Sequence, residues 1–175
     1  AYILREFGDA IGVPHSFTIL DEDDALMVVK AMTRRLELDP KQFPPARLRD
    51  IISKLKNDFV DPRTYAAESA DGHSRVVARV YELYEEELKR SAGVDFDDLL
   101  VKTVQLLTNN RVVLEEYQKR WGYMLVDEYQ DTNAAQYAFT KLLAGAHGNI
   151  TVVGDADQAI YSWRGADFRN ILNFE

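Results

Sequence analysis

The sequence predicts an α/β protein with a mostly helical N-terminal part and a parallel strand–helix–strand (βαβ) unit near the C-terminus. Apolar residues recur at helical spacing from the first residues to about residue 120. Two short apolar runs rich in β-forming residues, 123–126 and 150–153, follow, and residues 133–145 between them have helical spacing again. Strand, helix and strand in this order predict two parallel strands joined by a crossover.

The helical part contains several segments with recognisable ends. Helical spacing begins at residues 3–11, and residues 21–38 start with an acidic cluster at Asp21, which suits the positive end of a helix. Pro45 occupies a first-turn position of the next helix, and Ser74 is the expected N-cap of a helix over 74–90. Residues 95–107 and 111–121 predict two more helices, whereas 61–73 look least ordered.

The strand–helix–strand unit has its own signals. Both apolar runs are apolar on every residue, which is expected when both faces of a parallel sheet are covered. Asn133 and Gln136 are spaced as a capping pair at the start of the intervening helix, and Gly145 is placed to end it.

Composition excludes several classes of protein. The 175 residues contain no cysteine, which excludes disulfides and thiolate metal sites and favours the reducing cytoplasm. No apolar run reaches the length of a membrane span, so we expect no membrane partner. Both ends stop within helical patterns, and we therefore expect the chain to be a piece of a larger protein.

Charge is uneven along the chain. The net charge of -8 argues weakly against binding nucleic acid by bulk attraction. Residues 30–63, however, hold nine of the 21 Lys and Arg residues but five of the 29 acids. This segment can supply a basic face for duplex DNA, although a solvated helix surface is the more common explanation of any single Lys or Arg in it.

Acidic residues follow both predicted strands. Ligands of parallel sheets sit beyond the carboxyl ends of the strands, where Asp127, Glu128 and Asp155 are expected. Asp127 is placed to hold Mg²⁺, usually through water, and Glu128 to orient or deprotonate an attacking water. The alternative is that both acids only favour the N-terminus of the following helix.

Two blocks of sequence identify a family resemblance. "YMLVDEYQDTN" (123–133) and "VVGDADQAIYSWRGAD" (152–167) resemble motifs II and III of superfamily 1 DNA helicases of the UvrD, Rep and PcrA type. The upstream pieces "FTILDEDD" and "VDFDDLL" are similar to this family too. The resemblance implies that 93–175 are part of a RecA-like motor domain of the P-loop NTPase class. It also implies that 12–92 are a helical accessory subdomain and that the helix at 1–11 belongs to the motor.

The resemblance also implies roles at the nucleotide. Asp127 resembles the Mg²⁺-coordinating Walker B aspartate, and Glu128 resembles the catalytic base. Gln158 resembles the glutamine that senses the γ-phosphate of ATP, and Asp155 is expected to support that loop.

Tyr161, Trp163 and Arg164 resemble the DNA-facing residues of motif III. Stacking of an aromatic ring on a base is worth about 1–3 kcal/mol and tolerates any sequence, which suits a motor that steps along DNA. An adjacent arginine supplies a phosphate partner or a planar stacking surface. A shift of the loop from Gln158 to Trp163 would transmit the ATP state to the DNA. Taken singly, an aromatic residue after a strand more often packs in a core.

The function implied is that of an ATP-dependent DNA helicase. We expect translocation from 3′ to 5′ on single-stranded DNA, unwinding at a single/double-strand junction, and a role in DNA repair or replication, with ATP and Mg²⁺ as cofactors. No lysine in the chain follows a glycine, so the G-x-x-x-x-G-K-[ST] phosphate loop is absent. We therefore expect the isolated chain to be inactive as an ATPase.

Two other functions are compatible with the residues. The chain is alternatively a non-catalytic DNA- or protein-binding module that retains helicase motifs. A third reading groups Asp127, Asp155 and Asp157 as the metal site of a phosphatase or nuclease, which would cleave with Mg²⁺ but without ATP.

Overall fold

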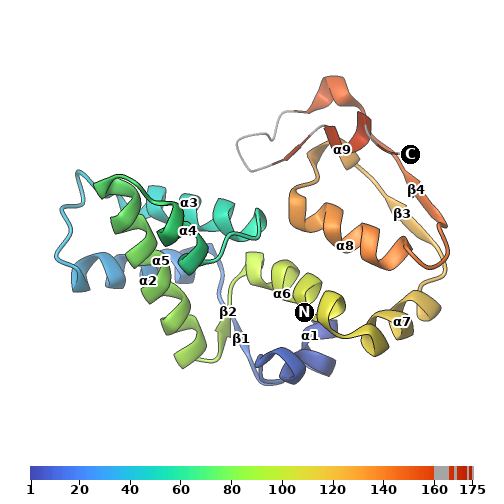
Figure 1. The fold of residues 1–175 in the computed structure, drawn as a ribbon, viewed down its shortest axis with the longest axis horizontal. Helices are drawn as coiled ribbons and strands as arrows, with labels where there is room; N and C mark the ends of the chain where they lie inside the picture. The colour runs from blue at the N-terminus through green and yellow to red at the C-terminus, as the bar shows by residue number, and fades with distance from the viewer. Residues whose placement is uncertain (160–165, 168, 173, 175) are drawn as a thin grey trace. The chain divides into compact units, whose positions relative to one another are not determined.

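The computed structural model describes residues 1–159, 166–167, 169–172 and 174, and the chain divides into two compact units (Figure 1). Unit 1 comprises Ala1–Gly12 and Leu100–Glu175, and unit 2 comprises Val13–Leu99. Residues 93–99, which the resemblance assigns to the motor, lie in unit 2, where Lys56 binds Asp95 and Asp98. The protein is mostly helical with small parallel sheets, as the predicted α/β class requires.

Unit 2 is built from four helices and one short pair of parallel strands. The helices are α2 (Glu22–Arg35), α3 (Pro45–Asn57), α4 (Pro62–Glu68) and α5 (Gly72–Arg90). The strands are β1 (Thr18–Ile19) and β2 (Gly93–Val94), and α6 (Phe96–Asn109) begins in this unit. Neither β1 nor β2 was predicted, because each strand is two residues long and an alternating pattern needs a longer run.

The helix starts in unit 2 confirm two predictions and correct two others. Asp21 caps α2 by accepting bonds from two backbone N–H groups, and Pro45 is the first residue of α3. Ser74 is not the cap of α5; Asp71 is, and it accepts the Ser74 N–H at 2.9 Å. The stretch expected to be least ordered contains α4, which Asp61 caps.

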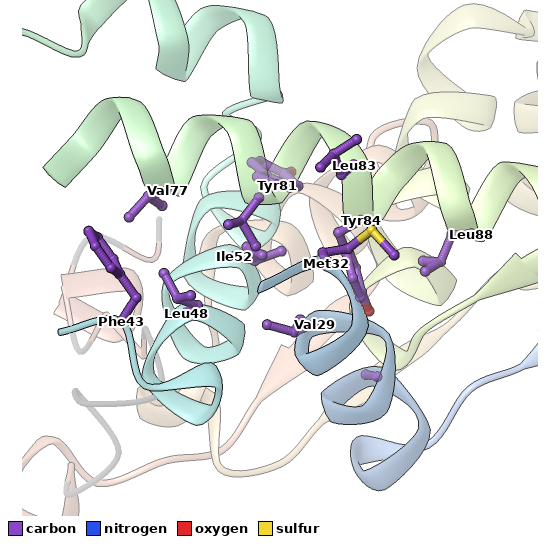
Figure 2. Close-up of a cluster of buried hydrophobic side chains, with 12 residues drawn as sticks. Val29, Met32, Phe43, Leu48, Ile52, Val77, Tyr81, Leu83, Tyr84 and Leu88 are labelled. Carbon is purple, nitrogen blue, oxygen red and sulfur yellow. The ribbon is translucent and has the colours of Figure 1, made fainter. Parts of the chain in front are cut away.

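The apolar core of unit 2 lies between α2, α3 and α5 (Figure 2). Val29 of α2, Ile52 of α3 and Val77 of α5 are each at most 2% exposed. The buried apolar residues of each helix recur at the helical spacing seen in the sequence. Burial of one apolar stripe per helix therefore holds these three helices together.

A buried ionic cluster, the Lys56 cluster, also holds unit 2 together. The Lys56 Nζ lies 2.7 Å from Glu85 Oε1, 2.7 Å from Asp95 Oδ2 and 3.0 Å from Asp98 Oδ1. Tyr84 donates its hydroxyl to Asp95 Oδ2 at 2.8 Å. Burial alone would lower the pKa of Lys56, but these three carboxylates raise it well above its usual value. The cluster joins α3 and α5 to the start of α6.

Unit 1 contains the strand–helix–strand unit and the helices around it. Its elements are α1 (Tyr2–Phe7), most of α6, α7 (Arg111–Arg120), β3 (Met124–Val126), α8 (Ala134–Ala144), β4 (Ile150–Val152) and α9 (Arg169–Leu172). Tyr117 of α7 is buried, donates its hydroxyl to Glu6 at 2.8 Å and packs edge-on against Phe7. Gln118 donates to the Leu142 carbonyl at 2.8 Å and so ties α7 to α8.

The predicted parallel strands are confirmed: β3 pairs with β4, and α8 connects them (Figure 1). Asn133 and Gln136 form the expected capping box, and Gly145 is the C-cap of α8. The expectation that both faces of the sheet are covered is wrong for the described residues, since Leu125 is 79% exposed at the centre of β3. None of the helices in the described part of the chain combines the length and the hydropathy of a membrane span.

Candidate active site

The carboxyl ends of β3 and β4 bring the two acidic loops together. The register pairs Val126 with Val152, so Asp127 and the loop after β4 lie at the same edge of the sheet. Backbone bonds continue past the strands, because Val153 donates to the Val126 carbonyl at 2.8 Å and accepts from the Tyr129 N–H at 2.9 Å. This is the edge at which ligands of parallel sheets bind.

Asp127 and Glu128 are both exposed at this edge. Glu128 has φ 52° and ψ 42°, a left-handed conformation that costs a residue with a side chain on the order of 1–3 kcal/mol. The Asp127 Oδ1 accepts the Glu128 N–H at 2.9 Å, which stabilises the sharp turn after β3. The chain thus turns away from the line of β3 at Glu128, and both carboxylates remain accessible to a ligand.

Gln130 lies directly behind this acidic pair and connects it to the second loop. Its side chain is 1% exposed. The Nε2 group donates to Glu128 Oε2 at 2.7 Å, and the Oε1 atom accepts the Asp155 N–H at 3.0 Å. The sequence offered no signal for this residue, because its second partner is 25 positions away and a glutamine in a polar loop is usually exposed.

Gly154 allows the two loops to approach so closely. A Cβ atom at this position would lie 2.7 Å from Ile171 Cδ1 and 3.1 Å from the Tyr129 backbone nitrogen, and it would also meet Gln130 Oε1. A glycine is therefore required by space rather than by backbone angle.

Asp155 organises the loop that carries Gln158. The Asp155 Oδ1 accepts the Asp157 N–H at 2.9 Å, and its Oδ2 accepts the Gln158 Nε2 at 2.7 Å. The bond from Gln158, and then that from Asp157, lower the pKa of Asp155, so this carboxyl stays ionised at neutral pH. Hydrogen bonds thus run in series from Glu128 through Gln130 and Asp155 to Gln158.

Three of the predicted site residues, Tyr161, Trp163 and Arg164, lie outside the described residues. Lys56 does not belong to the predicted basic face, because it is 3% exposed within its ionic cluster and is therefore unavailable to DNA. Arg49 contacts Glu22 and Asp50, and Lys54 contacts Asp58, so further charges of this segment are paired.

The donor set tests which metal chemistry fits. No three Asp, Glu or His side chains gather as a metal site in the described part of the chain, which argues against the phosphatase or nuclease cluster of Asp127, Asp155 and Asp157. The Mg²⁺ ion of a nucleotide site needs one or two carboxylates, and water and phosphate oxygens complete its shell. The exposed Asp127 carboxylate, at the carboxyl ends of β3 and β4, fits that requirement.

Comparisons with known proteins agree with the motifs. The UvrD/REP helicase N-terminal domain model matches residues 1–175. The chain is 48% identical to an ATP-dependent DNA helicase PcrA from Leuconostoc citreum and 47% identical to one from Staphylococcus aureus (strain Mu50), over 173 residues and 99% of this chain in both. A PcrA from Staphylococcus epidermidis is 46% identical over the same length.

The matched region is a small part of each relative. It covers 23% of the Leuconostoc protein and 24% of the Staphylococcus aureus protein, so the chain spans about a quarter of the length of these relatives. The family model, by contrast, matches this chain from its first residue to its last. The chain therefore belongs to the UvrD/REP helicase N-terminal domain family.

Proposed function

We propose that this chain is part of the ATP-driven motor of a longer DNA helicase. The observation that carries the proposal is the series of hydrogen bonds from Glu128 to Gln158 across the ends of two parallel strands. It joins a general-base candidate to a γ-phosphate-sensing candidate. The PcrA relatives, which are named ATP-dependent DNA helicases, support the same function.

Each site residue has a role in this proposal. Asp127 holds Mg²⁺, which would neutralise charge on the phosphates of ATP. Glu128 takes a proton from the attacking water, and Gln158 contacts the γ-phosphate. Asp155 keeps the Gln158 side chain in place through their 2.7 Å hydrogen bond. Tyr161, Trp163 and Arg164 contact single-stranded DNA by stacking and by phosphate pairing.

We assign unit 1 to the RecA-like motor and unit 2 to the helical accessory subdomain. Unit 1 supports the first assignment because it contains both strand-end loops, and unit 2 supports the second because it has a helical core of its own. The longer protein moves from 3′ to 5′ on single-stranded DNA, opens junctions with duplex DNA, and serves DNA repair or replication in the cytoplasm. The 175 residues alone lack a Gly-Lys-Ser/Thr phosphate loop and hydrolyse no ATP.

The decisive experiment is ATP hydrolysis stimulated by single-stranded DNA, measured on the full-length protein. Glu128→Gln should reduce the rate by about 10²–10⁴-fold, because the base is lost, while ATP still binds. Glu116→Gln is the matched control: it removes the same charge from an exposed position on α7, and the rate should not change. Trp163→Ala should weaken stimulation by DNA more than basal hydrolysis.

Two results would overturn the proposal. A Glu128→Gln protein that hydrolyses ATP at the wild-type rate would remove Glu128 from the reaction. A full-length protein that binds DNA but hydrolyses no ATP would instead be the non-catalytic binding module.

A further inference from the structure

Gln130 is a buried polar side chain to which the motifs assign no role. At 1% exposure it has lost its water, so each end of its amide needs a partner inside the protein. Both ends have one: the Nε2 donates to Glu128, and the Oε1 accepts from the Asp155 backbone. A glutamine that only filled space would cost stability compared with an apolar residue of similar size.

We infer that Gln130 is a positioning residue that holds the Glu128 carboxylate and links its place to the loop carrying Gln158. The inference rests on the proposed function, because it concerns the reaction assigned to Glu128. An uncharged amide cannot take the proton of the attacking water. Its contribution is therefore the position of the base, and not the chemical step.

The bond to Gln130 restrains a side chain that is otherwise open. Glu128 is exposed, stands in a left-handed turn and has several rotatable bonds. The 2.7 Å bond occupies one carboxylate oxygen, Oε2, and leaves Oε1 for a water molecule. A misplacement of about 1 Å in a catalytic group can cost on the order of 10²-fold in rate, so this restraint matters for a base.

The other end of Gln130 connects the base to the nucleotide-sensing loop. The Oε1 atom holds the Asp155 backbone, and the Asp155 carboxylate holds the Gln158 side chain. Gly154 lets this loop lie close against Gln130, since a Cβ there would meet Gln130 Oε1 and the Tyr129 backbone nitrogen. A displacement of Gln158 would then be passed along three hydrogen bonds to Glu128.

The experiment compares Gln130→Met with Gln136→Met in the full-length protein. Methionine keeps the length of glutamine and removes both hydrogen bonds. Gln136 is the matched glutamine, since it caps α8 in the same unit and, among the residues that the structure describes, bonds with Asn133. For Gln130→Met we expect kcat to fall about 10–100-fold. The KM for ATP should change less than about threefold, because binding and positioning are separate. Gln136→Met should lower the melting temperature without changing kcat.

Gln130→Glu supplies a readout that a structural role would not move. The new carboxylate can still accept the Asp155 N–H, but it faces Glu128 Oε2 across the position of a former hydrogen bond. Repulsion between the two carboxylates would displace Glu128, so kcat at pH 7 should fall at least as far as in Gln130→Met. The KM for ATP should again change less than about threefold, which a general loss of structure would not produce.

The outcomes separate the inference from the proposed function. If Glu128→Gln abolishes hydrolysis and Gln130→Met retains the wild-type kcat, the inference alone is overturned. It is also overturned if Gln130→Met and Gln136→Met lose kcat equally with the same fall in melting temperature. If Glu128→Gln keeps full activity, the proposed function fails and the inference fails with it. A double Glu128→Gln, Gln130→Met variant no slower than Glu128→Gln alone supports the inference, because the two residues act as a unit.

Discussion

Two strands of this chain, one in each parallel sheet, end at a valine that is followed by an aspartate, and the two aspartates have opposite surroundings. Asp95 follows Val94 at the end of β2 and is 5% exposed, with Lys56 and Tyr84 bound to its carboxylate. Asp127 follows Val126 at the end of β3 and is exposed. Within the described residues, its recorded hydrogen bond is to the neighbouring Glu128 N–H.

The difference shows that a carboxylate at a strand end has no fixed role. Its role depends on whether a cationic side chain of the protein binds it. A cation that reaches Asp95 from α3 replaces its water and turns the charge into a tertiary contact. Asp127 is exposed to solvent, so a hydrated Mg²⁺ or a nucleotide can reach its carboxylate. One Val-Asp therefore holds the fold of unit 2, and we propose that the other binds a ligand at unit 1.

Removing the Lys56 ammonium should have the largest effect on stability. Lys56→Met leaves the buried Asp95 and Asp98 and the half-buried Glu85 without their shared cation, and loss of one partner from a buried group typically costs about 3–5 kcal/mol. Urea unfolding followed by circular dichroism should show the transition of unit 2 at lower denaturant. Both tryptophans belong to the residue range of unit 1, so the transition seen by their fluorescence should move less.

Lys54→Met is the control for this comparison. Lys54 lies on the same helix and pairs with Asp58, but its side chain is 68% exposed, and exposed pairs contribute about 0–1 kcal/mol. Equal losses of stability in the two variants would show that burial of the Lys56 cluster contributes nothing special.

At the exposed site of unit 1, Gly154→Ala should have an intermediate effect on stability. The added methyl group meets the Tyr129 backbone and the Ile171 side chain, and overpacking of this kind costs about 1–3 kcal/mol. Tryptophan emission during urea unfolding should report the loss in unit 1. Gly122→Ala, where a Cβ would meet nothing within 4 Å, should change stability by less than about 0.5 kcal/mol. A Gly154→Ala chain as stable as wild type would mean that the two loops can separate at no cost.

Much of the fold could be predicted because its signals are local. Three apolar stripes predicted α2, α3 and α5, and the Asn133–Gln136 spacing predicted the start of α8. The helix α4 was missed although Asp61 and Pro62 carry the cap-and-proline signal used at Pro45, because none of its residues is buried and its apolar pattern is weak. The strands β1 and β2 depend on a pairing between residues far apart in the chain.

The candidate site divides in the same way. Asp127, Glu128 and Asp155 were predictable because the strand-end rule needs only the position of two strands. Gln130 was not, since its role follows from a bond to a backbone 25 residues away and from burial that no local pattern indicates. The exposed centre of β3 was also unpredictable, because an apolar strand has the same sequence whether or not its second face is covered.

The smallest expected effect comes from Asp97, beside the Lys56 cluster, and its sign is opposite to that of Asp95. Burial, and then the Asp95 charge, raise the pKa of Asp97, whereas Lys56 and the hydrogen bonds overcome burial and lower the pKa of Asp95. A carboxyl with a raised pKa contributes stability that is fully present below its unfolded pKa, near 3.9, and that is lost as pH rises through the folded value. At pH 7 its charge therefore opposes folding.

Asp97→Asn should accordingly stabilise the chain at pH 7 by less than about 1 kcal/mol, while the substituted amide oxygen can still accept the Asn57 bond. The gain should disappear below about pH 4, where the wild-type carboxyl is protonated in both states. Asp95→Asn should destabilise at pH 7, and its deficit should shrink as pH falls, because a lowered pKa contributes stability only above the unfolded value. Urea midpoints of the two variants at pH 3 and pH 7 provide the measurement. If both variants shifted the free energy of unfolding with the same sign, Asp97 would have to belong to the Lys56 cluster. The distinction between a neutralised charge at Asp95 and an opposed charge at Asp97 would then fail.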